Sequence, residues 1–238
     1  KVNFLLLSKL IIGDEGLNRL TLSSISINKN IKEITLSSLD ISINGLSELS
    51  LLFSKNEIQV ERLSINSCNL SVKSTDEKQI NIFNCYSTNN TIKDLILTNC
   101  NIKKESIVLF ESIRSSQIVN LDLSQNKIGP EEFKELLIFS ENSNVKNLYL
   151  NSNYISDLGV FYLDSFMTKT IMSPIFISIL FLNITLPSLY FKTNGSAKES
   201  FFLQILFKST FSNVSKIHKL NSSCNRMCNR SDMNSSHL

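Results

Sequence analysis

One pattern of apolar residues recurs six times in this 238-residue chain. Each copy is an eleven-residue segment with Leu, Ile or Val at its first, fourth, sixth and eleventh positions. The copies span 2–12, 31–41, 60–70, 92–102, 118–128 and 145–155, with starts 29, 29, 32, 26 and 27 residues apart. A unit of this size cannot bury its own apolar face, so the pattern predicts a stack of units that share one core.

Each segment and the stretch that follows it predict different secondary structures. Alternating apolar residues, as at Leu121 and Leu123, are typical of a short strand whose alternate side chains point to opposite faces. The stretch after the fifth segment starts with Pro130 and two glutamates, which suit a first helical turn. Apolar stripes at helical spacing are Leu17 and Leu20 in 16–22, Ile107, Phe110 and Ile113 in 106–113, and Phe133, Leu136 and Leu137 in 129–139. We therefore expect an α/β chain in which strands and helices alternate.

The third unit departs from this pattern between its apolar segment and the next one. Residues 73–90 are rich in Ser, Thr and Asn, and only Ile80, Ile82 and Phe83 remain to pack against a core. Weak periodicity and three extra residues predict a strand-like or looped segment here in place of a helix. Cys85 lies in this stretch and has no predicted partner.

The six segments match L-x-x-L-x-L-x-x-N/C-x-L, and over about residues 1–168 the chain resembles the leucine-rich repeat family. The long period and the Cys or Asn at the ninth position resemble its ribonuclease-inhibitor-like class. This resemblance implies a leucine-rich repeat solenoid, a curved horseshoe with parallel strands on its concave face and helices on its convex face. Residues 1–168 are then one domain of six repeats.

The ninth position of each segment carries a structural role. Asn126 and Asn153 occupy it in the last two segments, where a side-chain amide both donates to and accepts from backbone groups at a turn. Cys68 and Cys100 occupy the same position in the third and fourth segments, and we interpret them as packed ladder residues rather than redox or metal groups. The first two segments have leucine there, so these units are expected to lose the side-chain bond.

Residues 169–191 allow two interpretations. The stretch 171–191 is uncharged and long enough for a membrane span. Pro174, Pro187 and Asn183 disfavour an isolated helix in lipid, and the strand spacing recurs from Ile177. We expect a seventh repeat strand, with a membrane segment as the alternative.

The remaining residues, 192–238, form a basic tail rich in Ser and Asn that we expect to be partly disordered. Within it, 201–211 is expected to form a short amphipathic cap on the last repeat. His218, Cys224, Cys228 and His237 do not have the spacing of known zinc ligands, so no metal site is expected.

Charge and motif content exclude several classes of function. With 24 Lys and Arg against 21 Asp and Glu, the net charge of +3 is too even for a general nucleic-acid binder. No nucleophile with a placed base, phosphate-binding loop or pair of catalytic carboxylates is recognisable, so we expect neither an enzyme nor a cofactor. Five cysteines at low density suggest reduced thiols and a cytoplasmic location, and Lys9 interrupts the apolar start in a way that disfavours a signal peptide.

The outward-facing strand positions are the candidate binding residues. If residues alternate between the core and the surface, the third, fifth and seventh positions of successive segments project from the same concave side. The selected residues are Glu33, Arg62, Asp94, Asn120, Asp122, Asn147 and Tyr149. Arg62 and Tyr149 are residue types that often anchor interfaces, and Asp94 and Asp122 are expected to make the centre of this face acidic.

The family resemblance implies a role in protein interaction. Leucine-rich repeats of this class serve in ribonuclease inhibitor, in tropomodulin and CARMIL-type actin regulators, and in nucleotide-binding immune receptors. The predicted function is a scaffold that binds a protein partner on the concave face, with the partner's identity left open. Ran GTPase-activating proteins share this repeat type, so a GTPase-activating domain is an alternative, although no motif here identifies Arg19 or Arg62 with their arginine. A fragment of a membrane-attached receptor is the third possibility.

Overall fold

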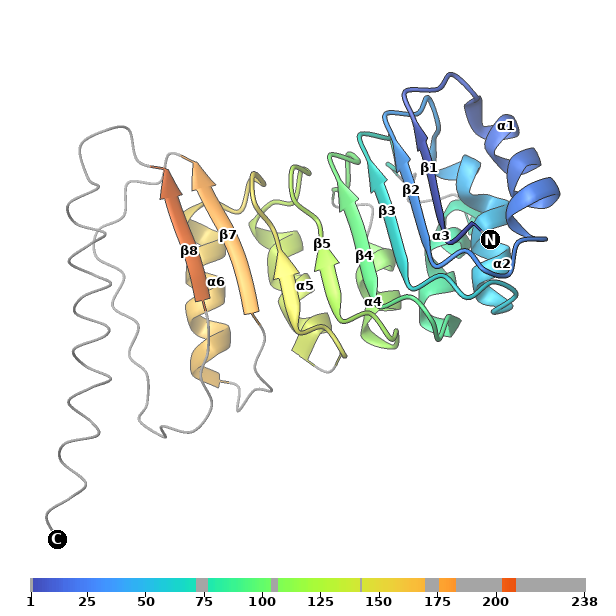
Figure 1. Ribbon diagram of the computed structural model, residues 1–238. Helices are drawn as coiled ribbons and strands as arrows, with labels where there is room; N and C mark the ends of the chain where they lie inside the picture. Colours follow the sequence, from blue (N-terminus) through green and yellow to red (C-terminus); the bar gives the residue numbers. More distant parts are fainter. Residues whose placement is uncertain are drawn as a thin grey trace, which may run out of the picture.

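A computed structural model of the protein describes residues 2–71, 77–103, 107–141, 143–169, 176–182 and 203–208. Strands and helices alternate along the chain, as expected for an α/β protein (Figure 1). The strands are β1 (Phe4–Ser8), β2 (Glu33–Ser37), β3 (Arg62–Asn66), β4 (Asp94–Thr98), β5 (Asn120–Asp122), β6 (Asn147–Tyr149), β7 (Phe176–Leu182) and β8 (Leu203–Lys208). The α-helices are α1 (Gly13–Leu20), α2 (Ser47–Ser54), α3 (Glu77–Thr88), α4 (Ile107–Arg114), α5 (Pro130–Glu141) and α6 (Ser156–Lys169).

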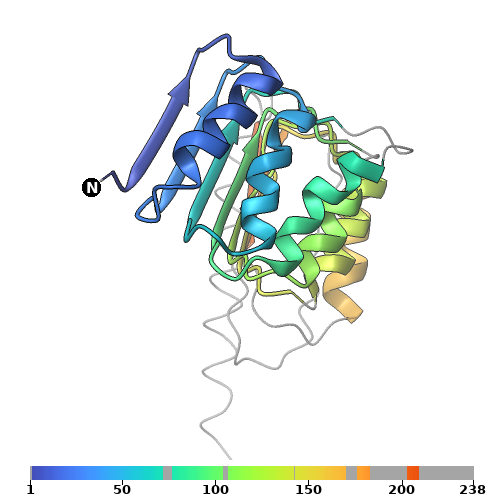
Figure 2. The same ribbon diagram turned by 90° about the vertical axis from the view of Figure 1, so that its right-hand side faces the viewer.

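The strands form one parallel sheet in the order of the sequence, β1 to β8. Residues at the same position of successive segments lie opposite one another, as in the pairs Arg62 with Asp94 and Asp94 with Asn120. The helices lie on one side of the sheet, and no described helix covers its other face (Figures 1 and 2). Every unit therefore presents its third and fifth positions to the same helix-free face.

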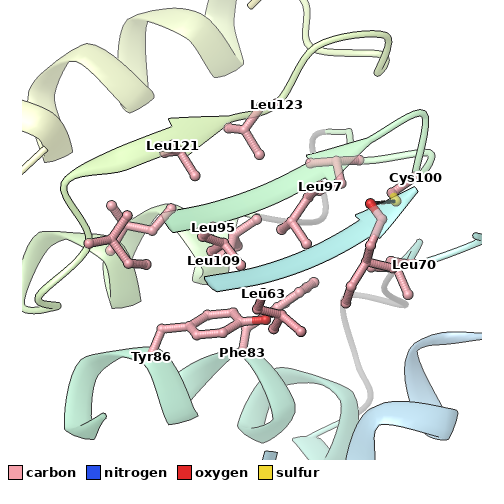
Figure 3. Packing of buried hydrophobic residues seen from close by; sticks show 14 of the residues in the cluster. Leu63, Leu70, Phe83, Tyr86, Leu95, Leu97, Cys100, Leu109, Leu121 and Leu123 are labelled. Atoms are coloured by element: carbon pink, nitrogen blue, oxygen red, sulfur yellow. Dashed lines mark hydrogen bonds between the residues drawn. The ribbon is translucent and has the colours of Figure 1, made fainter. Parts of the chain in front are cut away.

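The core lies between the sheet and the helices. Leucines at the fourth position, including Leu63, Leu95, Leu121 and Leu148, are almost completely buried. Figure 3 shows several of them packed in successive strands above the aromatic side chains of α3. A sheet covered by helices on one face buries one side of each strand, which explains the alternation along the segments.

Strands β5 and β6 are shorter than the sequence pattern predicts. β5 ends at Asp122, so Leu123 lies just beyond it, although the Leu123 amide still donates to the Tyr149 carbonyl at 2.9 Å. Leu123 is nevertheless completely buried. The sixth position of the segment therefore still faces the core, although it lies beyond the end of the regular strand.

The helix predicted over 129–139 is confirmed as α5. Its first turn contains Pro130 and two glutamates, and the Glu132 carboxylate accepts a hydrogen bond from the Gly129 amide at 2.9 Å. Phe133, Leu136 and Leu137 are buried against the sheet. Proline at the start and acidic residues in the first turn favour a helix that begins here.

The prediction for the third unit was wrong, because Glu77–Thr88 is helical and not looped. The side chains of Ile82, Phe83, Cys85 and Tyr86 are all buried. Positions 82 and 86 are one helical turn apart, and 83 lies beside them on the same face. The sequence pattern was weak because this face includes Cys and Tyr in place of leucine.

Part of the region after 170 lies within the described structure. β7 pairs in parallel with β6, and β8 pairs in parallel with β7. No described helix is both long enough and apolar enough to cross a membrane. β8 falls in the stretch expected to form an amphipathic cap. The expectations for the remainder of 183–238, including disorder and the absence of a zinc site, lie outside the described residues.

One backbone feature recurs in all six segments, and we did not predict it from the sequence. The eighth residue of all six segments has a left-handed conformation, with φ between 52° and 60°. These residues are Lys9, Ser38, Ser67, Asn99, Gln125 and Ser152. In the first five of them the amide donates to the seventh-position carbonyl of the next unit, as from Ser38 to Asn66 at 2.8 Å. The left-handed residue turns the chain away from the strand while still linking neighbouring units.

Candidate functional site

The third-position side chains form a continuous polar row across the helix-free face of the sheet. Arg62 Nη2 lies 2.7 Å from Asp94 Oδ2, and the Asn120 side-chain amide donates to the other oxygen of Asp94 at 2.5 Å. The side-chain amide of Asn147 in turn donates to Asn120 Oδ1 at 2.5 Å. Four strands, β3 to β6, thus contribute one side chain each to a row of direct contacts. Glu33 occupies the matching position of β2, opposite Arg62.

An open hollow of about 280 Å³ lies beside this row. It is lined by Arg62, Asp94, Ile96, Asn120, Asp122 and Tyr149, so five of the seven predicted binding residues come together in it. Glu33 and Asn147 do not line the hollow. Ile96 occupies the fifth position of its segment, which places it on the same face as Asp122 and Tyr149.

The two aspartates of the hollow differ in their electrostatic surroundings. The Arg62 guanidinium compensates the charge of Asp94, whose side chain is only 19% exposed. Asp122 Oδ1 accepts a hydrogen bond from the Ser124 amide at 2.9 Å. Among the described residues, no lysine or arginine forms an ion pair with Asp122. Within the described part of the chain, the charge of Asp94 is therefore compensated by an ion pair, whereas that of Asp122 is not.

The ninth-position asparagines bond the backbone where the chain leaves the strand. Asn126 Oδ1 accepts from the amides of Cys100 and Ile102 at 2.9 and 3.1 Å. Its Nδ2 donates to the carbonyls of Leu97 and Leu123 at 2.7 and 2.9 Å. One buried side chain thereby supplies partners to backbone groups of two neighbouring units.

Asn153 repeats this arrangement one unit later. Its Oδ1 accepts from the Ile128 amide at 3.1 Å, and its Nδ2 donates to the carbonyls of Leu123 and Leu150 at 2.9 and 3.1 Å. We refer to Asn126 and Asn153 together as the asparagine ladder. A side-chain amide suits this position because it provides two donors and an acceptor.

The first two units use carboxylates for the backbone bonds that the last two units make with asparagine. Asp40 Oδ1 accepts from the amides of Ile12 and Gly13 at 2.8 and 2.9 Å. The Gly13 amide makes the largest contribution to lowering the pKa of Asp40. Asp14 accepts from both the amide and the hydroxyl of Ser42. These units therefore lack the ninth-position amide but bond the same region of backbone with aspartate.

Cys68 and Cys100 are buried at the ninth positions of the third and fourth segments. The Cys100 thiol donates to the Ile65 carbonyl at 3.2 Å (Figure 3). Burial raises the pKa of Cys100 to about 12 and also raises the pKa of Cys68. Both thiols are neutral at physiological pH, which suits packing rather than nucleophilic chemistry.

We expect Cys68 and Cys100 to react slowly with a thiol reagent in the folded protein. The reactive species is the thiolate, and a raised pKa keeps it scarce. At about pH 8, a small model thiol, whose pKa lies near 8.5, should react much faster than these two cysteines. Mass spectrometry of the labelled peptides measures the rates, with the urea-unfolded chain as the reference. Labelling of the folded chain at the unfolded rate would contradict the buried position of these thiols.

The described part of the chain contains no group of three or more His, Cys, Asp or Glu residues placed to hold a metal ion. No protein-family model matches the chain, and no curated protein matches it.

Proposed function

We propose that the chain is a leucine-rich repeat solenoid of the ribonuclease-inhibitor-like class that acts as a protein-interaction scaffold. Its binding surface is the helix-free face of the sheet, centred on the hollow between Arg62 and Tyr149. The observation that carries this proposal is the alignment of side chains from successive units on one open face, where they form a polar row and a hollow.

Three repeated features support the repeat assignment. Equivalent positions pair between neighbouring strands, the eighth residue is left-handed in all six segments, and the asparagine ladder links successive turns. Each feature connects one unit to the next. Such nearest-neighbour contacts are typical of solenoid proteins.

The polar row also supports a binding role. Contacts between Arg62, Asp94 and Asn120 hold these side chains in place before any partner arrives. Side chains that are already ordered lose less conformational entropy on binding, which favours affinity. Arg62 and Tyr149 belong to residue types that are enriched among interface residues with large energetic contributions.

Non-enzymatic function and a cytoplasmic location are part of the same proposal. The described cysteines, Cys68, Cys85 and Cys100, are all free thiols, which suits a reducing compartment. The alternative of GTPase activation has less support, because Arg19 and Arg62 are each engaged in an ion pair, with Glu15 and Asp94 respectively. An arginine that stabilises a transition state must instead be available to the phosphate.

A blocking substitution tests the proposed binding face whatever the partner's chemistry. Ile96→Arg should fill the hollow with a long side chain and abolish capture of the partners that the wild-type chain retains from a cell lysate. Ile138→Arg is the matched control, because Ile138 is 45% exposed and lies on α5, on the helical side of the sheet. Both variants should melt close to the wild-type temperature, because Ile138 is exposed and Ile96 is half-buried on the open hollow rather than in the core.

Quantitative mass spectrometry of the captured proteins distinguishes the outcomes. The proposal requires partners that are lost with Ile96→Arg and kept with Ile138→Arg. If the two variants capture the same proteins as the wild type, or if only Ile138→Arg loses them, the helix-free face is not the binding surface.

A further inference from the structure

We infer that the hollow beside Asp122 receives an arginine or lysine side chain of the partner polypeptide. This inference rests on the proposed function and specifies the chemistry of the segment that the sheet face binds. It follows from the charges in the hollow, from the residues on either side of Asp122 and from the consequences of filling the hollow with other side chains.

The charge balance of the hollow favours a cation. Arg62 and Asp94 compensate each other at 2.7 Å, and Asn120 occupies the second oxygen of Asp94. The charge that remains is that of Asp122, whose known partner is the backbone amide of Ser124. An ionised carboxylate has room for several donors, so it can accept a further charge-assisted hydrogen bond.

The neighbours of Asp122 suit the remainder of a basic side chain. Tyr149 lies opposite Asp122 on β6, and Ile96 lies opposite it on β4. Successive strands are about 4.8 Å apart, so the three side chains stand next to one another in one row. An aromatic ring attracts a guanidinium or ammonium group, and an aliphatic residue packs against the methylene stem of Lys or Arg.

Other occupants fit this hollow less well. An acidic side chain meets like charge at Asp122, and repulsion of this kind disfavours a partner. An apolar side chain would remove water from Asp122 without supplying a donor, which is costly for a carboxylate. Arg62 does not relieve this cost, because its guanidinium is paired with Asp94.

Peptide selection tests the inference. A phage-displayed library of random peptides is selected on the immobilised full-length chain, and the selected peptides are remade synthetically. Those whose binding is lost with Ile96→Arg are assigned to the sheet face. We expect each of these peptides to contain one Arg or Lys whose replacement by citrulline or alanine weakens binding to the wild-type chain about tenfold.

A cross-comparison with Asp122→Asn links that basic residue to Asp122. On this variant the unmodified peptide should bind about tenfold more weakly, and replacement of its basic residue should cost less than about twofold, because the two groups act as a pair. Asp157→Asn, an exposed acidic position on α6, is the matched control and should leave both measurements unchanged.

The results separate this inference from the proposed function. Peptides that are sensitive to Ile96→Arg but need no basic residue, or that respond to its loss equally on wild type and Asp122→Asn, overturn the inference and leave the binding face intact. If every selected peptide is insensitive to Ile96→Arg, the binding face itself is wrong. A selection that yields no peptide counts against both.

Discussion

Leu123→Asp is expected to unfold the chain. Leu123 is completely buried between the sheet and the helices, and the described buried residues include no Lys or Arg that could pair with a carboxylate. A buried, unpaired charge costs several kcal/mol, which is a large fraction of the about 5–15 kcal/mol that stabilises a typical domain. Urea unfolding followed by circular dichroism should show the loss of the cooperative transition.

The control for this substitution is Leu158→Asp. Leu158 is 44% exposed in the first turn of α6, where an acidic side chain interacts favourably with the helix dipole. We expect its unfolding midpoint to stay close to that of the wild type. A cooperative transition for Leu123→Asp at the wild-type midpoint would show that Leu123 does not face the core.

Asn126→Ala has the second largest expected effect. The substitution leaves the amides of Cys100 and Ile102 and the carbonyl of Leu97 without their side-chain partner. An unsatisfied buried group costs about 1–3 kcal/mol, so we expect the free energy of unfolding to fall by about 3 kcal/mol or more. This exceeds the usual effect of a single hydrogen bond because one side chain serves several backbone groups.

Two comparisons define the contribution of the asparagine ladder. Asn153→Ala should destabilise less than Asn126→Ala, because Asn153 is only half-buried and the Leu123 carbonyl keeps its bond to Asn126. Cys100→Ser should also be milder if the thiol mainly packs against its neighbours. Equal and small decreases in the free energy of unfolding for all three variants, measured by urea titration, would contradict a stabilising role for the asparagine ladder.

The apolar spacing was sufficient to predict where β1 to β6 lie and that helices alternate with them. Each of β1 to β6 falls inside one of the six segments, and α5 begins at the proline that suggested its start. These elements were predictable because their signal comes from burial, which acts on residue type at fixed intervals. The role of the ninth-position asparagines was also predictable, because they recur at the same position of successive segments.

Other features could not be predicted because they depend on neighbouring units or on backbone conformation. The sequence did not show that Arg62, 32 residues before Asp94, forms an ion pair with it. The left-handed eighth residues include Lys9 and Gln125, which do not signal a positive φ as Gly or Asn would. Helix α3 was missed because Tyr86 and Cys85 were not counted as part of its apolar face.

Methyl NMR contacts between the fourth-position leucines test the stacking of units in register most directly. Leu121 lies opposite Leu95 on one side and Leu148 on the other. With neighbouring strands about 4.8 Å apart, the methyl groups of Leu121 should show strong nuclear Overhauser contacts to both, and those of Leu95 should show none of similar strength to Leu148. A strongest contact from Leu121 to Leu97 in place of Leu95 would mean a two-residue shift in register, and would contradict the polar row and the binding face derived from it.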